Sequence, residues 1–156
     1  MNKRIVEYPN PILRKKAIVI KEITDEVKRL AKDMKEIIME KDGIGLAAPQ
    51  VGASKRLIAV FLKDKPEVFL NPKILRKSRK TNIIEEGCLS FPGLFLKIKR
   101  AKDIDLEYLN LNGERIKMKV EGLLARVFQH EIDHLDGILF IDRISLPQKL
   151  CRLLKN

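Results

Sequence analysis

The sequence predicts an α+β fold in which antiparallel strands pack around a central helix, with an N-terminal helix and a short C-terminal helix. Two observations support this prediction. Apolar residues recur at helical spacing over 23–38 and again over 122–137. Between these segments, stretches of alternating apolar and polar residues follow one another without intervening helices. Such clustering of strands is typical of α+β proteins rather than of parallel α/β proteins.

The N-terminal part begins with an extended arm and continues as a helix. Pro9 and Pro11 punctuate residues 1–20 and disfavour a regular element there. The helix that follows is expected to close at Gly43, because glycine commonly ends helices. Its apolar face is formed by Ile23, Val27, Leu30, Met34, Ile37 and Ile38.

Several segments in the middle of the chain have the composition and alternation of strands. Pro72 interrupts the second of them, and Asn112-Gly113 is a typical hairpin turn between the last two. The expected strands span 56–62, 68–75, 95–99, 104–109 and 116–120.

The second helix is bracketed by Gly122 and Gly137 and is the most apolar helix of the chain. It is therefore expected to lie at the centre of the fold. After it, Ser145-Leu-Pro-Gln148 has the form of a capping box, which predicts the short terminal helix.

Length and composition restrict the class of protein. The 156 residues fit one domain, 1–156, because a chain of this size buries roughly 70% of its unfolded surface in a single core. No segment resembles a membrane span or a secretory signal. The two cysteines, Cys88 and Cys151, are too few for a disulfide scaffold, so we expect a reducing, cytoplasmic setting. The net charge of +11 favours loose attraction to polyanions, but no motif predicts sequence-specific nucleic-acid binding.

The strongest chemical signal is the segment His130-Glu131-Ile132-Asp133-His134 within the second helix. Residues four apart lie on the same helix face, so both imidazoles can reach one metal ion. Glu131 lies beside them and can act as a base toward water. The alternative is a surface helix with two solvated histidines, which the apolar character of this segment disfavours.

A catalytic metal site usually takes three protein ligands, and the chain contains no third histidine. Asp142 lies shortly after the second histidine and could instead cap or pair with a neighbour. Cys151 lies in a basic tail and has the position of a helix-face residue. Cys88 lies in Glu85-Glu86-Gly87-Cys88-Leu89-Ser90, between a probable strand and Pro92, and is the preferred third ligand.

The segment Gly43-Ile44-Gly45-Leu46-Ala47-Ala48-Pro49-Gln50 allows two interpretations. Taken alone, it is more simply a helix C-cap followed by small residues packed on the core. In the functional interpretation, its glycines let the backbone approach a peptide closely, and Gln50 presents an amide donor. The Lys and Ser/Thr of a phosphate-binding loop are absent.

Together these segments resemble the peptide deformylase family. Its GxGLAAxQ, EGCLS and HExxH motifs occur in that order at Gly43 to Gln50, Glu86 to Ser90 and His130 to His134. The similarity continues through the opening EYPNPILRKKA and the late DHLDGILFIDRIS, so it covers nearly the whole chain. The resemblance implies a metal-dependent hydrolase that removes the N-formyl group from the initiator methionine of newly made polypeptides and releases formate.

The resemblance also implies roles for individual residues. A divalent metal ion, iron(II) in most of the family and replaceable by zinc, nickel or cobalt, would be held by Cys88, His130 and His134. Glu131 would transfer protons, while the Gln50 amide and the Leu89 backbone N–H would stabilise the carbonyl oxygen. Substrate binding would involve the backbone around Gly45 and a methionine pocket formed by Ile44, Leu123 and Val127. Glu86 and Arg100 would form a supporting ion pair.

The chain departs from the family pattern at one place. Some bacterial members carry an arginine shortly after EGCLS that meets the far end of the substrate, whereas residues 91–96 contain no cation. The expected partners are N-formylmethionyl peptides and nascent chains. Contact with ribosomes through a basic surface is a further expectation, with tail candidates Lys149, Arg152 and Lys155.

Two other functions would use some of the same residues. A zinc endopeptidase would share the two-histidine helix, take a downstream carboxylate such as Asp142 as its third ligand and not need Cys88. A structural zinc site in an RNA-binding module would need four ligands, so Cys151 would have to join Cys88 and the histidines.

Overall fold

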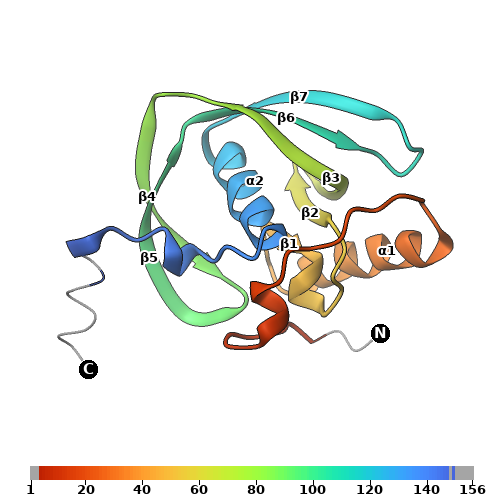
Figure 1. Ribbon diagram of the computed structural model, residues 1–156, viewed down its shortest axis with the longest axis horizontal. Helices are drawn as coiled ribbons and strands as arrows, with labels where there is room; N and C mark the ends of the chain where they lie inside the picture. The colour runs from red at the N-terminus through yellow and green to blue at the C-terminus, as the bar shows by residue number, and fades with distance from the viewer. Residues whose placement is uncertain (1–3, 148, 150–156) are drawn as a thin grey trace.

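A computed structural model describes residues 4–147 and 149 (Figure 1). Its main sheet is antiparallel, with strand order β1-β2-β3-β6-β7, and a second sheet consists of β4 and β5 alone. The main sheet contains β1 (Gly45–Ala47), β2 (Leu57–Leu62), β3 (Lys65–Lys77), β6 (Asp103–Leu109) and β7 (Arg115–Glu121). The smaller sheet contains β4 (Thr81–Cys88) and β5 (Phe91–Ala101). This is the predicted α+β fold.

Two helices cover opposite faces of the main sheet, α1 (Asp25–Glu40) and α2 (Gly122–Leu135). Strand β2 shows how one sheet packs against both helices. Ile58 and Val60 point into the cluster shared with α2, whereas Leu57 and Ala59 point into the cluster shared with α1. Because successive side chains of a strand alternate between faces, a strand buried on both sides must be almost entirely apolar.

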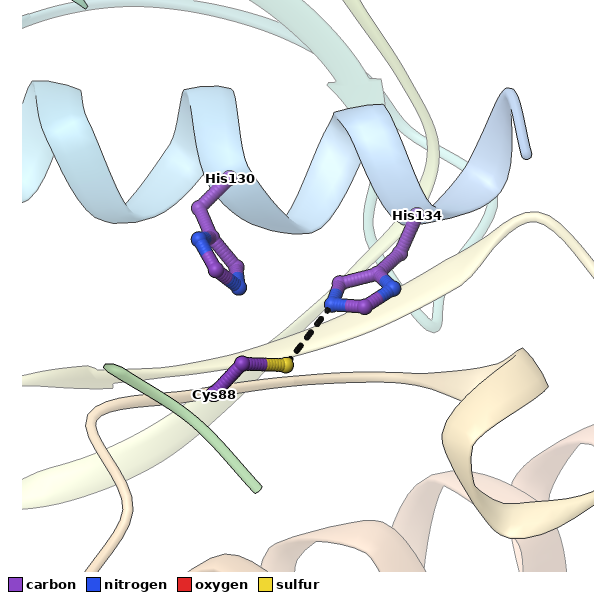
Figure 2. A group of neighbouring side chains, drawn as sticks. All are labelled: Cys88, His130 and His134. Atoms are coloured by element: carbon purple, nitrogen blue, oxygen red, sulfur yellow. Dashed lines mark hydrogen bonds between the residues drawn. The ribbon is translucent and has the colours of Figure 1, made fainter. Parts of the chain in front are cut away.

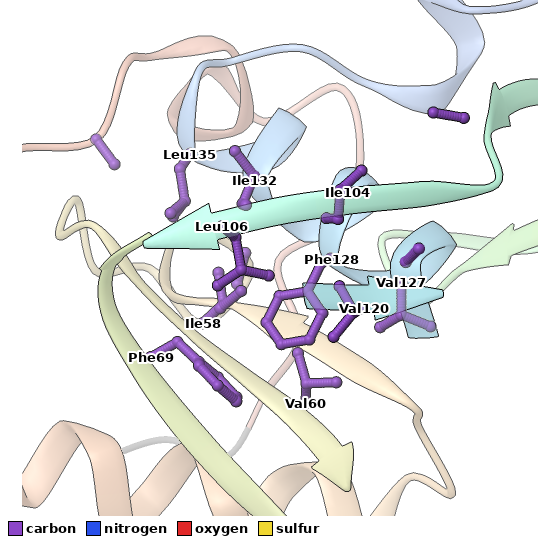
Figure 3. Packing of buried hydrophobic residues seen from close by; sticks show 14 residues of the cluster. Ile58, Val60, Phe69, Ile104, Leu106, Val120, Val127, Phe128, Ile132 and Leu135 are labelled. Atoms are coloured by element: carbon purple, nitrogen blue, oxygen red, sulfur yellow. The ribbon is translucent and has the colours of Figure 1, made fainter. Parts of the chain in front are cut away.

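The cluster between the sheet and α2 contains Phe69 and Phe128, which are among the largest fully buried side chains of the described residues (Figure 3). Phe128 of α2 packs edge-on against Phe69 of β3, with ring centroids 4.8 Å apart. Burial of such a side chain contributes roughly 1.5–3 kcal/mol, so this contact anchors α2 to the sheet.

Helix α2 is enclosed on more than one side, which explains why every residue from Ala125 to Leu135 is buried. A third cluster joins the β4–β5 sheet to segments from both ends of the chain, including Leu13, Ile98 and Phe140. These terminal segments contain short 3₁₀ turns at η1 (Pro11–Arg14) and η3 (Phe140–Asp142), and a third turn, η2 (Ala48–Val51), follows β1. The polar residues near the end of α2 are therefore held by packing on all sides.

Several local predictions need correction. Helix α1 ends at Glu40, and the left-handed position after it is Asp42, with φ 49°, not Gly43. The arm over residues 1–20 contains the η1 turn, because the Asn10 side chain accepts a hydrogen bond from the Ile12 N–H and caps it. The segment after Gly43 is not merely packed on the core, since Gly45 begins strand β1.

The strands also differ from the expectation in extent. Strand β3 runs through Pro72 by means of a register shift between Leu70 and Lys73. The hairpin between β6 and β7 has a five-residue loop, 110–114, rather than a two-residue turn; the Asn110 side-chain oxygen accepts hydrogen bonds from the Asn112 and Glu114 N–H groups. Strand β4 was expected only as a probable strand before Cys88.

At the C-terminus, Leu146, Pro147 and Lys149 are helical, and the Lys149 N–H donates to the Ser145 carbonyl at 3.0 Å. Gln148, Cys151, Arg152 and Lys155 lie outside the described residues. Over the part of the chain that is described, no helix is long and apolar enough to cross a membrane.

Candidate active site

Helix α2 and the end of β4 bring three metal-ligating side chains together (Figure 2). His130 and His134 lie one helical turn apart, and both imidazoles point toward Cys88, the last residue of β4. The Cys88 Sγ lies 3.3 Å from the His134 Nε2, and one ligand atom from each residue lies within 4.8 Å of the other two. Around one tetrahedral ion, sulfur and nitrogen ligands lie roughly 3.5 Å apart, so this donor set fits a divalent cation.

Glu86 orients the first of these imidazoles from within β4. Its Oε2 lies 2.9 Å from the His130 Nδ1, which leaves the His130 Nε2 available for a cation. Arg100 of β5 binds the same carboxylate through two hydrogen bonds of 2.6 and 3.1 Å. Burial would raise the pKa of Glu86, but the hydrogen bonds from His130 and Arg100 outweigh it and lower the pKa to about 2. Glu86 is therefore a carboxylate at neutral pH.

Two further charged residues of α2 belong to this network and were missed by the sequence analysis. The Arg126 Nη1 donates to the Glu86 Oε1 at 2.6 Å and to the Ile98 carbonyl at 2.9 Å. Asp133 accepts a hydrogen bond of 2.8 Å from Arg100. Helical spacing could have indicated Arg126, because it lies four residues before His130 and therefore on the same helix face.

Glu131 is only 4% exposed, and among the described residues its Oε2 has no hydrogen-bond partner. Burial raises the pKa of Glu131 to about 7, so the group can accept and release a proton near neutral pH. Gly45 of β1 lies directly against this side chain. A Cβ at position 45 would meet the Glu131 carboxylate and would lie 2.8 Å from both the Glu131 Cγ and the Val127 Cγ1. Glycine at this position therefore makes room for Glu131.

Gln50 reaches the site from η2. Its Oε1 accepts a hydrogen bond of 2.8 Å from the Ala47 N–H, which fixes the direction of the amide. The Nε2 then donates toward the Ser90 Oγ at 3.2 Å and the Cys88 Sγ at 3.5 Å. Leu89 follows Cys88 directly and packs, partly buried, against the α1 side of the core.

These groups border one cavity of about 670 Å³. Its lining includes every residue expected to contact the substrate and every expected catalytic residue: Ile44, Gly45, Gln50, Leu89, Leu123, Val127 and Glu131. Cys88 and His130 also border it, so the cluster of ligand atoms lies next to open space.

Asp142, the carboxylate considered as a third ligand, is engaged elsewhere. It forms two hydrogen bonds with Arg14, of 2.5 and 3.1 Å, and accepts a third from the Leu139 N–H. Within the described residues, the group able to hold a metal ion consists of Cys88 and the two histidines. The geometry thus gives no support to a carboxylate-ligated site.

A buried helix that presents two imidazoles and a carboxylate beside a cysteine sulfur, at the border of a cavity, defines a metal-dependent hydrolase. Residues 2–150 match the family model described as polypeptide deformylase. The chain belongs to this family, and it removes N-formyl groups from formylmethionyl polypeptides.

Individual relatives agree with this assignment. The chain is 47% identical over 147 residues to the peptide deformylase of Desulforudis audaxviator, covering 94% of this chain and 96% of that protein. The crystal structure of the Thermotoga maritima peptide deformylase is 45% identical, with a TM-score of 0.88, covering 91% of this chain and 97% of that one. An Acinetobacter baumannii class I type b peptide deformylase, solved with Met-Ala-Ser bound, is 35% identical, with a TM-score of 0.86, covering 90% and 96% of the two chains.

The contact between Gly45 and Glu131 leads to a testable expectation. Gly45→Ala should displace the Glu131 carboxylate and lower kcat/KM for formate release by about 100-fold, since small misplacements of catalytic groups have effects of this size. Gly43→Ala is the matched control, because its Cβ would lie 3.2 Å from the flexible Ile38 side chain. Equal losses in the two variants would contradict a specific role of Gly45, and metal content and circular dichroism would show that both proteins are folded.

Proposed function

We propose that Cys88, His130 and His134 hold one divalent cation and that the hydrolysis of the formyl group takes place beside it. The observation that carries this proposal is the meeting of these three ligand atoms next to the buried Glu131 and the cavity. When bound, the cation supplies Lewis acidity, which makes water more acidic and a carbonyl group more electrophilic. Iron(II) is the ion we infer from the resemblance to the family, although the same donors also suit zinc, nickel and cobalt.

Glu131 acts as the proton carrier of the reaction. Its carboxylate accepts a proton from water while the water oxygen attacks the formyl carbon. The proton then passes from Glu131 to the amide nitrogen as the bond between carbon and nitrogen breaks. Formate and a peptide with a free amino terminus leave the site. Two observations support this role of Glu131. The side chain is buried, and its Oε2 has no hydrogen-bond partner among the described residues.

The oxygen of the formyl group gains negative charge during the attack. Gln50 and Leu89 both line the cavity, and the Gln50 Nε2 lies 3.5 Å from the Cys88 Sγ. We assign this amide and the Leu89 backbone N–H as hydrogen-bond donors to this oxygen. One such donor typically contributes roughly 3–4 kcal/mol to catalysis. The tight hydrogen bond from the Ala47 N–H to Gln50 supports this assignment, because it aims the amide in advance.

The remainder of the substrate occupies the cavity. Backbone groups at Gly45 bind the peptide, and Ile44, Leu123 and Val127 take the methionine side chain. The Acinetobacter baumannii relative with bound Met-Ala-Ser supports binding of a methionine-initiated peptide by this fold. Glu86 and Arg100 position the site, because together they hold the His130 ring.

We further infer that the chain forms one catalytic domain, 1–156, working in the cytoplasm and in contact with ribosomes. A basic corner, defined by the exposed Lys77, Arg79, Lys80 and Lys102, supports the ribosome contact. Backbone hydrogen bonds hold its two turns together, from Ser78 N–H to the Asp103 carbonyl and from Lys102 N–H to the Lys80 carbonyl. Among the described residues these four side chains form no ion pair, so they can bind RNA phosphates.

Loss of the proton carrier tests the mechanism. Glu131→Ala should lower kcat for formate release from a formyl-methionyl peptide by roughly 10²–10⁴, the usual contribution of a general acid–base. Glu131→Gln keeps the size of the side chain and should lose as much, with metal content unchanged. Activity of Glu131→Gln close to that of the wild type would contradict the assigned role.

Metal analysis tests the ligand set and separates the alternatives. Anaerobically purified wild type should contain about one iron per chain. Cys88→Ala should lose the metal and the activity, because only the two histidines would remain of the three protein ligands that a catalytic site usually has. Cys151→Ser should retain both. Retention by Cys88→Ala would favour the endopeptidase, metal loss in Cys151→Ser would favour a closed structural site, and zinc in place of iron would overturn the inferred ion.

Charge reversal tests the basic corner. Replacing three of its cations by glutamate should weaken co-sedimentation with ribosomes by about tenfold or more, and the loss should shrink as salt increases. The variant is Lys77→Glu, Arg79→Glu and Lys80→Glu. A control with the same change of charge on exposed residues outside the corner is Lys16→Glu, Arg29→Glu and Lys32→Glu. Equal weakening of both variants would show attraction by net charge alone.

A further inference from the structure

Three large apolar side chains lie at the mouth of the catalytic cavity, although the protein as a whole is strongly charged. Ile44, Phe95 and Leu123 line the cavity and are 51%, 62% and 58% exposed. Val127 and Glu131, which line it as well, are 8% and 4% exposed. Exposure therefore increases from the buried reacting groups to these three side chains, so a peptide whose formyl group lies at Glu131 can leave the cavity past them.

Phe95 occupies a defined place at this mouth. On the β4–β5 hairpin Glu86 pairs with Leu96, and the register shifts between Glu86 and Cys88, where Gly87 lies next to Phe95. A Cβ at Gly87 would lie 2.8 Å from the Phe95 Cε1, so the ring rests directly on the Gly87 backbone. Gly87 immediately precedes the proposed ligand Cys88. The Phe95 ring thus lies against the Gly87 backbone, while most of the side chain remains exposed.

Charged groups at the mouth do not favour an acidic ligand. Glu7, Asp42 and Glu85 line the cavity with exposed carboxylates, against one exposed ammonium group at Lys41. Arg126 also borders the cavity, but it is 4% exposed and bound to Glu86. A negatively charged residue of the substrate would therefore meet more repulsion than attraction at the mouth.

We propose that Phe95 is a specificity-determining residue that packs against an apolar side chain at the second or third position of the nascent chain. The proposal rests on the deformylase function and extends it to substrate preference after the methionine. Successive residues of an extended peptide advance by about 3.3 Å, so these positions lie within reach of the mouth when the formyl group is at Glu131. Large apolar residues gain contact with the ring, whereas acidic residues gain none and meet the carboxylates.

Formate release from two series of C-terminally amidated peptides tests this preference. The peptides are formyl-Met-X-Ser and formyl-Met-Ala-X, with X as Leu, Phe, Ser or Asp. In at least one series, wild-type kcat/KM should be roughly five- to twentyfold higher for Leu and Phe than for Asp, as expected for one partly buried side chain. Phe95→Ala should remove this advantage by raising KM for the Leu and Phe peptides more than for the Ser and Asp peptides, and Phe95→Leu should retain most of it.

Ile83→Ala is the matched control, because Ile83 is 64% exposed on the same hairpin but does not line the cavity. It should leave the preference unchanged. A uniform loss on all peptides in Phe95→Ala would show that the ring supports the Cys88 segment rather than the substrate, and would overturn the proposal. Equal rates of the wild type on all peptides, or a preference for Asp, would overturn it too. Failure of the wild type to release formate from any peptide would instead contradict the deformylase function.

Discussion

The buried carboxylate of Glu86 is the interaction on which the site depends. It joins three elements, because it comes from β4, binds Arg100 of β5 and contacts both Arg126 and His130 of α2. A charge taken out of water needs full compensation by partners, and removing one partner of a buried ion pair typically costs roughly 3–5 kcal/mol. The same contacts that satisfy this charge also align His130 with the end of β4, where Cys88 lies. The contacts that stabilise the buried network therefore also fix the geometry of the ligand cluster.

The periodicity of apolar residues in the sequence predicted both helices and most strands of the main sheet. The helices were predictable because α1 and α2 each bury a continuous apolar face. Periodicity did not predict β1, because a strand of three residues is too short to show alternation. It predicted β4 only weakly, because the exposed positions of β4 are not consistently polar. The end of α1 could not be predicted from residue preferences alone. Asp42 takes the left-handed conformation there, whereas Gly43 does not.

The candidate site could be predicted from the sequence only where its residues are brought together by local geometry. Helical spacing places His130 and His134 together by local geometry, whereas the third ligand lies 42 positions earlier and depends on how β4 docks against α2. The roles of Arg126 and Asp133 depend on the same docking, because their partners Glu86 and Arg100 belong to other elements. Asp142 illustrates the converse. Its sequence position near His134 suggested a ligand, but the fold brings Arg14 to it and uses the pair to join the two terminal segments.

Two glycines that line the cavity, Gly45 and Gly87, leave room for side chains of neighbouring elements. The absence of a Cβ at Gly45 lets Glu131 lie against β1, and the absence of a Cβ at Gly87 lets Phe95 lie against β4. In both cases a side chain from a neighbouring element covers the bare backbone, one at the reacting end of the cavity and one at its mouth. An extended peptide between these two points would meet a proton carrier first and an apolar surface later. The reaction at the first residue of the substrate and the recognition of the following residues thus take place at different points along the bound peptide. The preference for the following residues can therefore change without disturbing the ligands of the metal.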